Sequence, residues 1–283
     1  MNVARTKAEL RDALAPLRPR GEVGLVPTMG SLHDGHLSLL RGARERCDVV
    51  VMSLFVNPTQ FGPSEDLEAY PRDEKRDLSL AEAEGVDVVY APGVDEVYPD
   101  GFATAVEVGG GLTDVLDGDR ARRGPEHFRG VTTVVAKLFN SVRPDVAFFG
   151  AKDAQQAAVI ARMARDLDFD IEIAVLPTVR EPDGLALSSR NAYLDPPERR
   201  RAAAISRALR AAEQAAAPGT ATDAALAAAR AELDAAGIDP EYLEARDAET
   251  LAPAPSFNGR PVLVAVAARV GRARLIDNTV IGG

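Results

Sequence analysis

The chain has 283 residues, and its 33 lysines and arginines against 43 aspartates and glutamates give a formal net charge of −10. A chain this acidic is not expected to hold nucleic acid through its overall charge. Hydrophobic residues make up 46% and charged residues 27%, which is typical of a folded globular protein with one large or two medium domains. No apolar run reaches the roughly 20 residues that span a bilayer, and the start lacks a signal-peptide pattern. We therefore expect a cytoplasmic protein without membrane or nucleic-acid partners, in which the single cysteine, Cys47, is a core residue.

Apolar runs alternate with helical patterns along the first 179 residues. Thr6 and Glu9 form a capping-box pattern, which predicts a first helix that ends near Pro16. Buried strands are predicted at 22–28, 48–56, 86–92, 145–150 and 169–179, and the helices between them at 36–46, 77–85, 131–142 and 154–167. This alternation predicts an α/β domain of residues 1–179 with a doubly wound, Rossmann-like parallel sheet. Its ligand crevice should lie at the carboxyl ends of the strands.

The pattern changes after about Val179, where Ala-rich helices begin. Asp195 and Glu198 form a second capping box, with Pro196 at the first helical position. A further helix is predicted at 222–237, and a terminal hairpin at 261–270 and 272–278. We therefore expect a smaller α+β domain of residues 180–283 that acts as a lid.

A first polar group follows the strand at 22–28, in the segment PTMGSLHDGH. Gly30 permits close approach of the backbone, and the start of the next helix offers N–H groups to an anion. His33 and His36 lie one helical turn apart, so two imidazoles could grip a polyphosphate. Two other interpretations stay open here. The pair could simply cap the helix or be solvated, or it could join His127 in a zinc site of three histidines.

A second polar group, Asn57, Thr59 and Gln60, follows the next predicted strand. It lies in a loop at 57–65 that is rich in proline and glycine and is typical of a binding loop. Carboxamides there can orient a small hydroxy acid without adding a charge. The alternative is a turn stiffened by proline.

The segment FFGAKDAQQ forms a third group, with Gly150 at a strand end and Lys152 just before a helix. This arrangement favours phosphate binding, although it lacks the P-loop pattern. Lys152 would neutralise phosphate charge, and Asp153 could cap the helix or hold a ribose hydroxyl or magnesium. Gln156 lies about one turn further along the same helix.

A fourth group lies in the loop at 180–194, near the expected domain boundary. Ser188, Ser189 and Arg190 can together hold phosphate oxygens, with the arginine as a bidentate donor. The alternative is a surface loop without a binding role.

Taken in order, these motifs resemble the pantoate–β-alanine ligase family, within the HIGH-motif nucleotidyltransferase superfamily. The resemblance rests on VPTMGSLHDGH, FVNPTQFG, YPR, HFRGV, VAKLFN, FFGAKDAQQ and LALSSRNAYL, and covers most of the first two hundred residues. It implies ATP-dependent condensation of (R)-pantoate with β-alanine through a pantoyl adenylate, with release of AMP and diphosphate. It further implies magnesium with ATP as co-substrate, and a homodimer.

The resemblance also implies roles for individual residues. The catalytic set is His33, His36, Lys152 and Arg190, with His36 as the family's proposed proton donor. Gln60 and Gln156 would bind pantoate, Gln60 would also bind β-alanine, and Asp77 is a candidate ligand for magnesium. The implied ATP ligands are Met29, Gly30, Ser31, Leu32, His33, Asp34, Gly35, His36, Gly150, Ala151, Lys152, Asp153, Val179, Leu187, Ser188, Ser189 and Arg190.

One position departs from the family pattern. Where the family usually has RPxHF, this chain reads RRGPEHF, with Gly124 in place of the arginine. Arg123, one position early, or Arg129 could supply that charge. Three rival functions stay open: another small-acid adenylyl or nucleotidyl transferase on the same fold, a zinc hydrolase with three histidines, and a nucleotide sensor without catalysis. They differ in nucleotide preference, bound zinc and diphosphate release.

Overall fold

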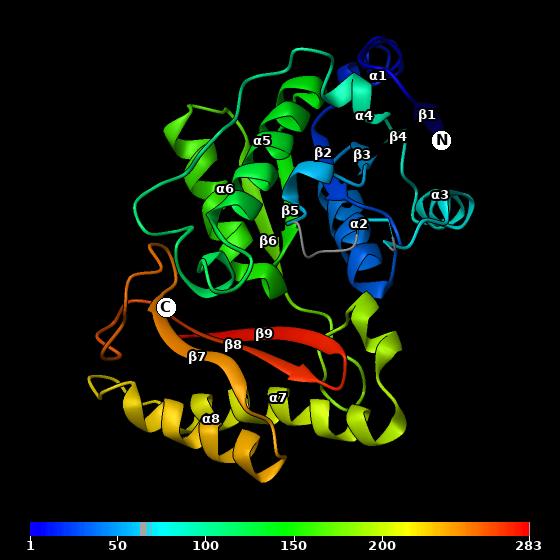
Figure 1. Ribbon diagram of the computed structural model, residues 1–283. Helices are drawn as coiled ribbons and strands as arrows, with labels where there is room; N and C mark the ends of the chain where they lie inside the picture. Colours follow the sequence, from blue (N-terminus) through cyan, green and yellow to red (C-terminus); the bar gives the residue numbers. More distant parts are fainter. Residues whose placement is uncertain (63–66, 69, 283) are drawn as a thin grey trace. The chain divides into compact units, whose positions relative to one another are not determined.

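The computed structural model describes residues 1–62, 67–68 and 70–282 (Figure 1). Of the loop predicted at 57–65, residues 63–65 therefore lie outside the described part. The chain divides into two compact units. The first comprises Met1–Gly150 and Val159–Leu176, and the second comprises Ala151–Ala158 and the chain from Pro177 onward. No helix within the described ranges is long and apolar enough to cross a membrane.

A six-stranded parallel sheet forms the centre of the first unit. Its strands are β1 (Asn2–Ala4), β2 (Val23–Thr28), β3 (Val49–Leu54), β4 (Val88–Tyr90), β5 (Val146–Gly150) and β6 (Glu172–Leu176), in the order β1-β4-β3-β2-β5-β6. The winding of the chain reverses between β2 and β5, which confirms the doubly wound sheet and places the switch point there. The edge strand β1 was not predicted, because its segment Asn2–Ala4 is not part of an apolar run, whereas the equally short β4 lies within the apolar run at 86–92.

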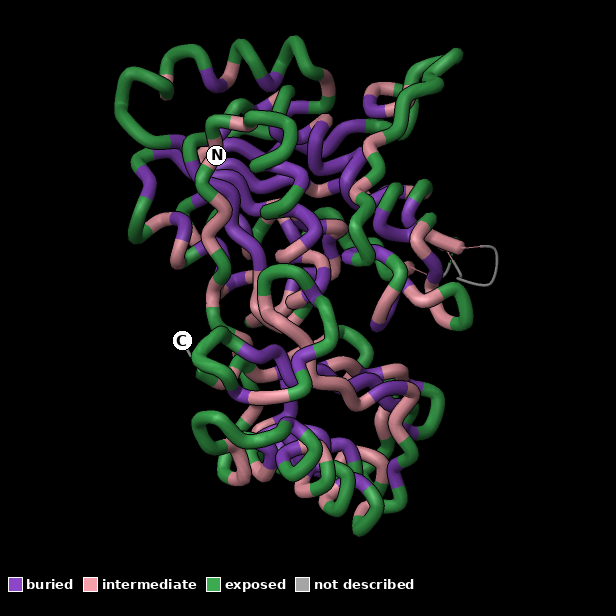
Figure 2. Tube along the Cα trace, turned by 90° about the vertical axis from the view of Figure 1, so that its left-hand side faces the viewer, coloured by how far each residue is buried: buried purple, intermediate pink, exposed green. Residues whose placement is uncertain are grey.

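Helices cover both faces of this sheet. They are α1 (Lys7–Leu14), α2 (Asp34–Arg46), α3 (Glu74–Ala83), α4 (Val94–Val97), α5 (Pro125–Val142) and α6 (Ala154–Asp166), with short 3-10 turns η1 (Arg18–Arg20), η2 (Pro58–Gln60) and η3 (Leu116–Gly118). The turn η4 (Ala151–Asp153) and the start of α6 belong to the second unit. One hydrophobic cluster joins α1, α5 and the end of α6 to one face, and a second joins α2 and α3 to the other. Along β3, Val49 and Val51 belong to the first cluster and Val50 and Met52 to the second. This burial on both faces explains the near-continuous apolar runs of the strands (Figure 2).

Local signals in the first unit are confirmed by the structure. The Thr6 hydroxyl accepts the Glu9 N–H at 3.1 Å, and the Glu9 carboxylate accepts the Thr6 N–H at 3.3 Å, so the capping box of α1 is complete. Cys47 is buried as predicted, and burial raises the pKa of its thiol to about 11.

The second unit packs two helices on a three-stranded antiparallel sheet (Figure 1). Its elements are η5 (Ser189–Tyr193), α7 (Pro196–Ala215), α8 (Asp223–Ala235), β7 (Pro240–Asp247), β8 (Val262–Val270) and β9 (Ala273–Ile281). The capping box of Asp195 and Glu198 is present, and β8 and β9 form the predicted hairpin. β7 was not predicted, because its charged residues obscure the alternation of a strand that pairs with β8. Together with the large parallel sheet, this unit confirms the predicted fold class.

Candidate active site

A buried carboxylate holds the loop between β2 and α2. Gly30 (φ 83°) and Ser31 (φ 53°) both have positive φ, and a Cβ on Gly30 would lie only 2.8 Å from Leu54 Cδ1. Both features favour glycine at position 30. Asp77 is 1% exposed; its Oδ2 accepts the N–H of Ser31 at 2.8 Å and its Oδ1 accepts the N–H of Leu32 at 2.8 Å. Asp77 thus fixes the loop that leads into α2.

His33 and His36 cap the first turn of α2. Nδ1 of His33 accepts the N–H of Gly35 at 3.2 Å, and Nδ1 of His36 accepts the N–H of His33 at 3.4 Å. The two ring centroids lie 4.1 Å apart. The capping interpretation is therefore confirmed. It is compatible with anion binding, because a neutral imidazole that accepts at Nδ1 carries its proton on Nε2 and can donate there.

The described residues offer no three-histidine zinc site. No group of three or more histidine, cysteine, aspartate or glutamate side chains within the described ranges is arranged to hold a metal ion. His127, the third histidine, is 6% exposed, and its Nδ1 lies 2.8 Å from the main-chain oxygen of Gln60. His127 therefore helps to position the segment that follows β3.

A buried carboxamide network lies after β3. Asn57 is 1% exposed and Gln60 is 8% exposed. Asn57 Nδ2 donates to Gln60 Oε1 at 3.0 Å and to the main-chain oxygen of Gly130 at 3.1 Å. The Gln60 Nε2 group lies 3.2 Å from the sulfur of Met29, which is a weak acceptor. Asn57 thus orients the Gln60 amide so that its NH2 group can donate to a stronger acceptor, such as a ligand oxygen.

Tyr98 belongs to the same network and was missed from the sequence. Its hydroxyl donates to Asn57 Oδ1 at 2.7 Å, and it lies 3.2 Å from the Thr59 hydroxyl. Burial raises the pKa of Tyr98, so the phenol stays protonated and able to donate at neutral pH. The surrounding segment EVYPD has no motif that would single out this tyrosine.

In the second unit, η4 carries Lys152. Its side chain is 19% exposed, and its Nζ lies 3.8 Å from Asp153 Oδ2. Asn278, a buried residue of β9, donates from Nδ2 to the main-chain oxygens of Ala151 at 2.9 Å and Lys152 at 2.8 Å. Asn278 therefore holds the backbone of Lys152 and not its side chain. The Lys152 amine can move to contact a ligand without a change in the backbone.

Ion pairs hold the loop that precedes α7. Arg180 donates from Nη1 and Nη2 to Asp277 at 2.6 and 3.0 Å, and the Asp277 side chain is only 1% exposed. Arg199 pairs with Glu181 at 2.7 Å and with Asp183 at 2.9 Å. The hydrogen bond from Arg199 lowers the pKa of Glu181. These contacts give the loop a defined conformation.

The same loop carries the fourth predicted group. The N–H of Leu187 donates to the main-chain oxygen of Val179 at 3.0 Å. The Ser188 hydroxyl accepts the Arg190 N–H at 3.3 Å and caps η5. Arg190 is exposed, and its guanidinium makes no ion pair with any carboxylate in the described part of the chain. The backbone of Arg190 is thus held in place by the cap of η5, while its exposed guanidinium can contact an anion.

The predicted site residues are distributed over both units. The first unit brings together the loop and helix start at residues 29–36 with Gln60 and Asp77, and Gly150 ends β5 at the carboxyl edge of the same sheet. The second unit holds residues 151–153, Gln156, Val179 and residues 187–190.

Comparison with known proteins agrees with these observations. A family model described as pantoate-beta-alanine ligase matches residues 2–280. The pantothenate synthetase of Moorella thermoacetica is 55% identical over 284 residues, which cover 99% of each chain. The solved pantothenate synthetase of Thermus thermophilus is 50% identical, with a TM-score of 0.90 over 99% of each chain. Pantoate-beta-alanine ligase from Francisella tularensis, solved in complex with beta-gamma ATP and beta-alanine, is 32% identical, with a TM-score of 0.80 over 99% of this chain and 97% of that one. The chain therefore belongs to the pantoate–β-alanine ligase family, whose reaction is the ATP-dependent condensation of pantoate with β-alanine.

Proposed function

We propose that this chain condenses pantoate with β-alanine in two half-reactions, with ATP as co-substrate. In the first, a pantoate carboxylate oxygen attacks the α-phosphate of ATP, which forms pantoyl adenylate and releases diphosphate. In the second, the amine of β-alanine attacks the acyl carbon, loses a proton and releases AMP. The observation that carries this proposal is the position of a helix start with two imidazoles next to a buried carboxamide pair, joined by the contact of Gln60 with Met29.

The phosphate side of the reaction is assigned to groups that can donate or carry positive charge. His33 and His36 would donate from Nε2 to phosphate oxygens, with His36 as the proton donor, and neither would act as a nucleophile. Lys152 and Arg190 would stabilise the charge that develops on the leaving diphosphate. We propose that the other residues implied by the family resemblance also bind ATP.

The binding of the acid substrate, pantoate, is assigned to uncharged side-chain amides. Gln60 and Gln156 would bind the hydroxyl and carboxylate oxygens of pantoate, and Gln60 would also contact β-alanine. An amide holds a carboxylate without the strong charge pairing that would make its oxygens poorer nucleophiles. The burial of Asn57 and Gln60 supports this assignment, because a rigid donor loses little entropy when the substrate binds.

Magnesium is proposed as the ion that accompanies ATP. Asp77 is the candidate protein ligand; each of its oxygens already accepts one N–H, and each keeps a further lone pair. A single buried carboxylate supplies too few ligands to bind a metal ion by itself. We therefore propose that phosphate oxygens of ATP and water would supply the remaining ligands, which is the usual arrangement for magnesium.

The larger-scale expectations also belong to this proposal. They are a homodimer, a cytoplasmic location, and two functional domains at 1–179 and 180–283, of which the second acts as a lid. A lid would exclude water from the hydrolysable adenylate.

The proposed two-step reaction is tested by withholding the amine. With ATP, magnesium and pantoate alone, the protein should release about one diphosphate per site and then stall, because a closed site protects the adenylate. Addition of β-alanine should discharge it and produce pantothenate and AMP. A preference for CTP would favour a nucleotidyl transferase, and ATP binding without diphosphate release would favour a sensor. Either result would contradict the proposal.

The role of Asp77 in holding the loop gives a specific prediction. Asp77→Asn offers one acceptor in place of two, so one N–H of the pair at Ser31 and Leu32 loses its partner. The unpaired buried N–H should lower the free energy of unfolding by about 1 to 3 kcal/mol, and the less firmly held loop should raise the KM for ATP. The measurement is the KM for ATP, together with the melting temperature.

Asp73→Asn is the matched control, because Asp73 caps the same helix by accepting the Arg76 N–H, and asparagine caps equally well. It should leave the KM for ATP unchanged. If a higher magnesium concentration restores the activity of Asp77→Asn, Asp77 is a magnesium ligand rather than a positioning residue.

A further inference from the structure

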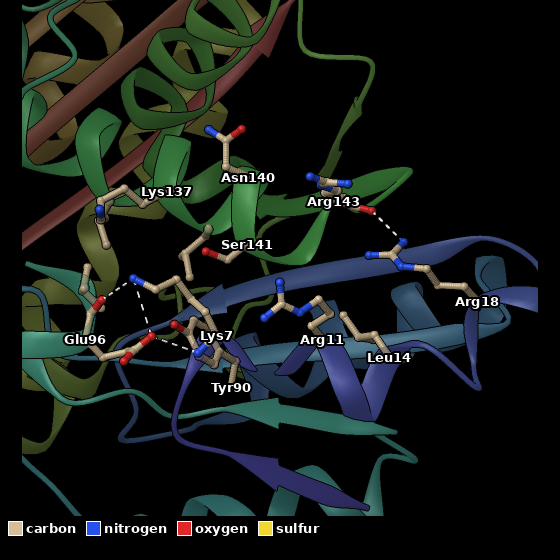
Figure 3. A pocket seen from close by; sticks show the side chains of 13 residues that line it. Lys7, Arg11, Leu14, Arg18, Tyr90, Glu96, Lys137, Asn140, Ser141 and Arg143 are labelled. Carbon is tan, nitrogen blue, oxygen red and sulfur yellow. Dashed lines mark hydrogen bonds and ion pairs between the residues drawn. The ribbon is translucent and has the colours of Figure 1, made fainter. Parts of the chain in front are cut away.

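A cavity of about 610 Å³ lies between α1 and α5 in the first unit (Figure 3). Its volume is within the range of about 300 to 1,000 Å³ that small-molecule sites occupy. Its described lining includes none of the residues assigned above to ATP, pantoate, β-alanine or magnesium. The cavity is therefore separate from the candidate active site.

Positive charge dominates the lining of this cavity. Among the described lining residues, five side chains are cationic, Lys7, Arg11, Arg18, Lys137 and Arg143, and the only carboxylate is Glu96. These residues thus carry a formal charge of +4 in a chain whose net charge is −10. Lys7 lies 3.5 Å from Glu96, which neutralises only one of the five cations.

The other four cations are not neutralised by acidic residues in the described part of the chain. Arg18 donates to the main-chain oxygens of Val142 and of Arg143, the latter at 3.1 Å. Arg11, Lys137 and Arg143 form no ion pair with any residue in the ranges that the structure describes. Burial lowers the pKa of Lys137, and the charge of Lys7 lowers it further. The Lys137 ammonium also lies 4.5 Å from the centroid of the Phe102 ring. Lys7 and Lys137 repel each other, and a bound anion would relieve that repulsion.

The inner wall of the cavity is apolar. Leu14, Val97, Val134 and Leu138 are all buried and line it, and Tyr90 is 2% exposed. Burial raises the pKa of Tyr90 to about 12, so the phenol adds no negative charge. An apolar wall with a cationic rim suits a ligand that has both an apolar part and negative charge.

We propose that this cavity is a second ligand site, which binds an organic anion with an apolar body and at least two negative charges, such as an aryl phosphate ester. The charged groups would lie among Arg11, Lys137 and Arg143, and the apolar body would contact the small part of the leucine and valine side chains that faces the cavity. Asn140 and Ser141, which also line the cavity, can donate hydrogen bonds to the same oxygens.

Isothermal titration calorimetry with 1-naphthyl phosphate tests this proposal. The full chain is first saturated with the β,γ-methylene analogue of ATP, so that the nucleotide site is occupied. The parent should bind one further equivalent of the probe, less tightly as salt is raised. In Arg11→Gln/Lys137→Gln the Kd should rise at least about tenfold, because both of the positive charges that are removed from the lining would attract the anion.

Lys75→Gln/Arg200→Gln is the matched control, with the same change of net charge at two exposed residues of α3 and α7. It should bind the probe like the parent, and both variants should melt at the parent's temperature. The proposal is overturned if the parent does not bind, or if the two double variants bind equally. It is also overturned if inorganic phosphate binds as tightly as 1-naphthyl phosphate, because the apolar wall would then contribute nothing.

Discussion

Replacement of Lys152 by alanine is expected to lower kcat/KM by about 30- to 160-fold, equivalent to about 2 to 3 kcal/mol of transition-state stabilisation. The amine is the group that would neutralise charge on the leaving diphosphate. Since Asn278 binds the backbone of η4 and not the lysine side chain, the fold should be unaffected. Steady-state kinetics and a melting curve measure the two effects separately.

Lys75→Ala is the control for this prediction, because Lys75 is an exposed lysine of α3 with no ion pair among the described residues. It should leave both kcat and KM unchanged. Near-normal turnover of Lys152→Ala at an unchanged melting temperature would contradict the proposed role of Lys152.

Asp277→Ala is expected to lower the free energy of unfolding by about 3 kcal/mol. Removing one partner of a buried ion pair typically costs about 3 to 5 kcal/mol, and the lower figure applies because Arg180 keeps 31% of its side chain exposed. Most of this loss of stability comes from the guanidinium of Arg180, because it loses both of its hydrogen bonds to Asp277 while it stays partly buried. Equilibrium unfolding in urea, followed by circular dichroism, measures the change.

Two further variants separate the buried pair from a general effect of charge. Asp239→Ala removes a carboxylate that is 89% exposed and pairs with Arg230 at 3.0 Å, so it should cost less than about 0.5 kcal/mol. Arg180→Leu/Asp277→Leu removes both charges and should recover much of the loss. Equal destabilisation by Asp239→Ala and Asp277→Ala would show that burial of the pair contributes nothing.

Elements with local signals could be predicted from the sequence. The capping boxes at Thr6 and Asp195 involve residues three positions apart, so the pattern alone reveals them. The strands β2 to β5 of the large sheet are largely buried and lie in apolar runs of the sequence, and β6, although more exposed, lies in the apolar run at 169–179. β1 and β7 could not be predicted in this way, because the first lies outside any apolar run and half of the residues of the second are charged. Their formation depends on pairing with β4, which is distant from β1 in the sequence, and with β8, which follows β7 along the chain.

In the candidate site, too, only features with a local signal could be predicted from the sequence. Polar residues that follow a strand could be singled out, because parallel strands end at one edge of the sheet. The contacts that position them could not be predicted, although the family resemblance singles out Asp77 as a candidate magnesium ligand. Asp77 reaches the backbone of Ser31 from 46 residues away, Tyr98 reaches Asn57 from 41, and Arg180 reaches Asp277 from 97. None of these contacts leaves a pattern in the sequence, because only the tertiary structure brings the partners together.

The central claim, attack of the pantoate carboxylate on the α-phosphate of ATP, is tested most directly by isotope transfer. Pantoate labelled with oxygen-18 in its carboxylate is mixed with the protein, ATP, magnesium and β-alanine, and the products are analysed by mass spectrometry after rapid quench. An adenylate route places one labelled oxygen in AMP, because the acyl–oxygen bond of pantoyl adenylate breaks in the second step. Formation of ADP and inorganic phosphate, with the label in phosphate and none in AMP, would mean an acyl-phosphate route and would contradict the account.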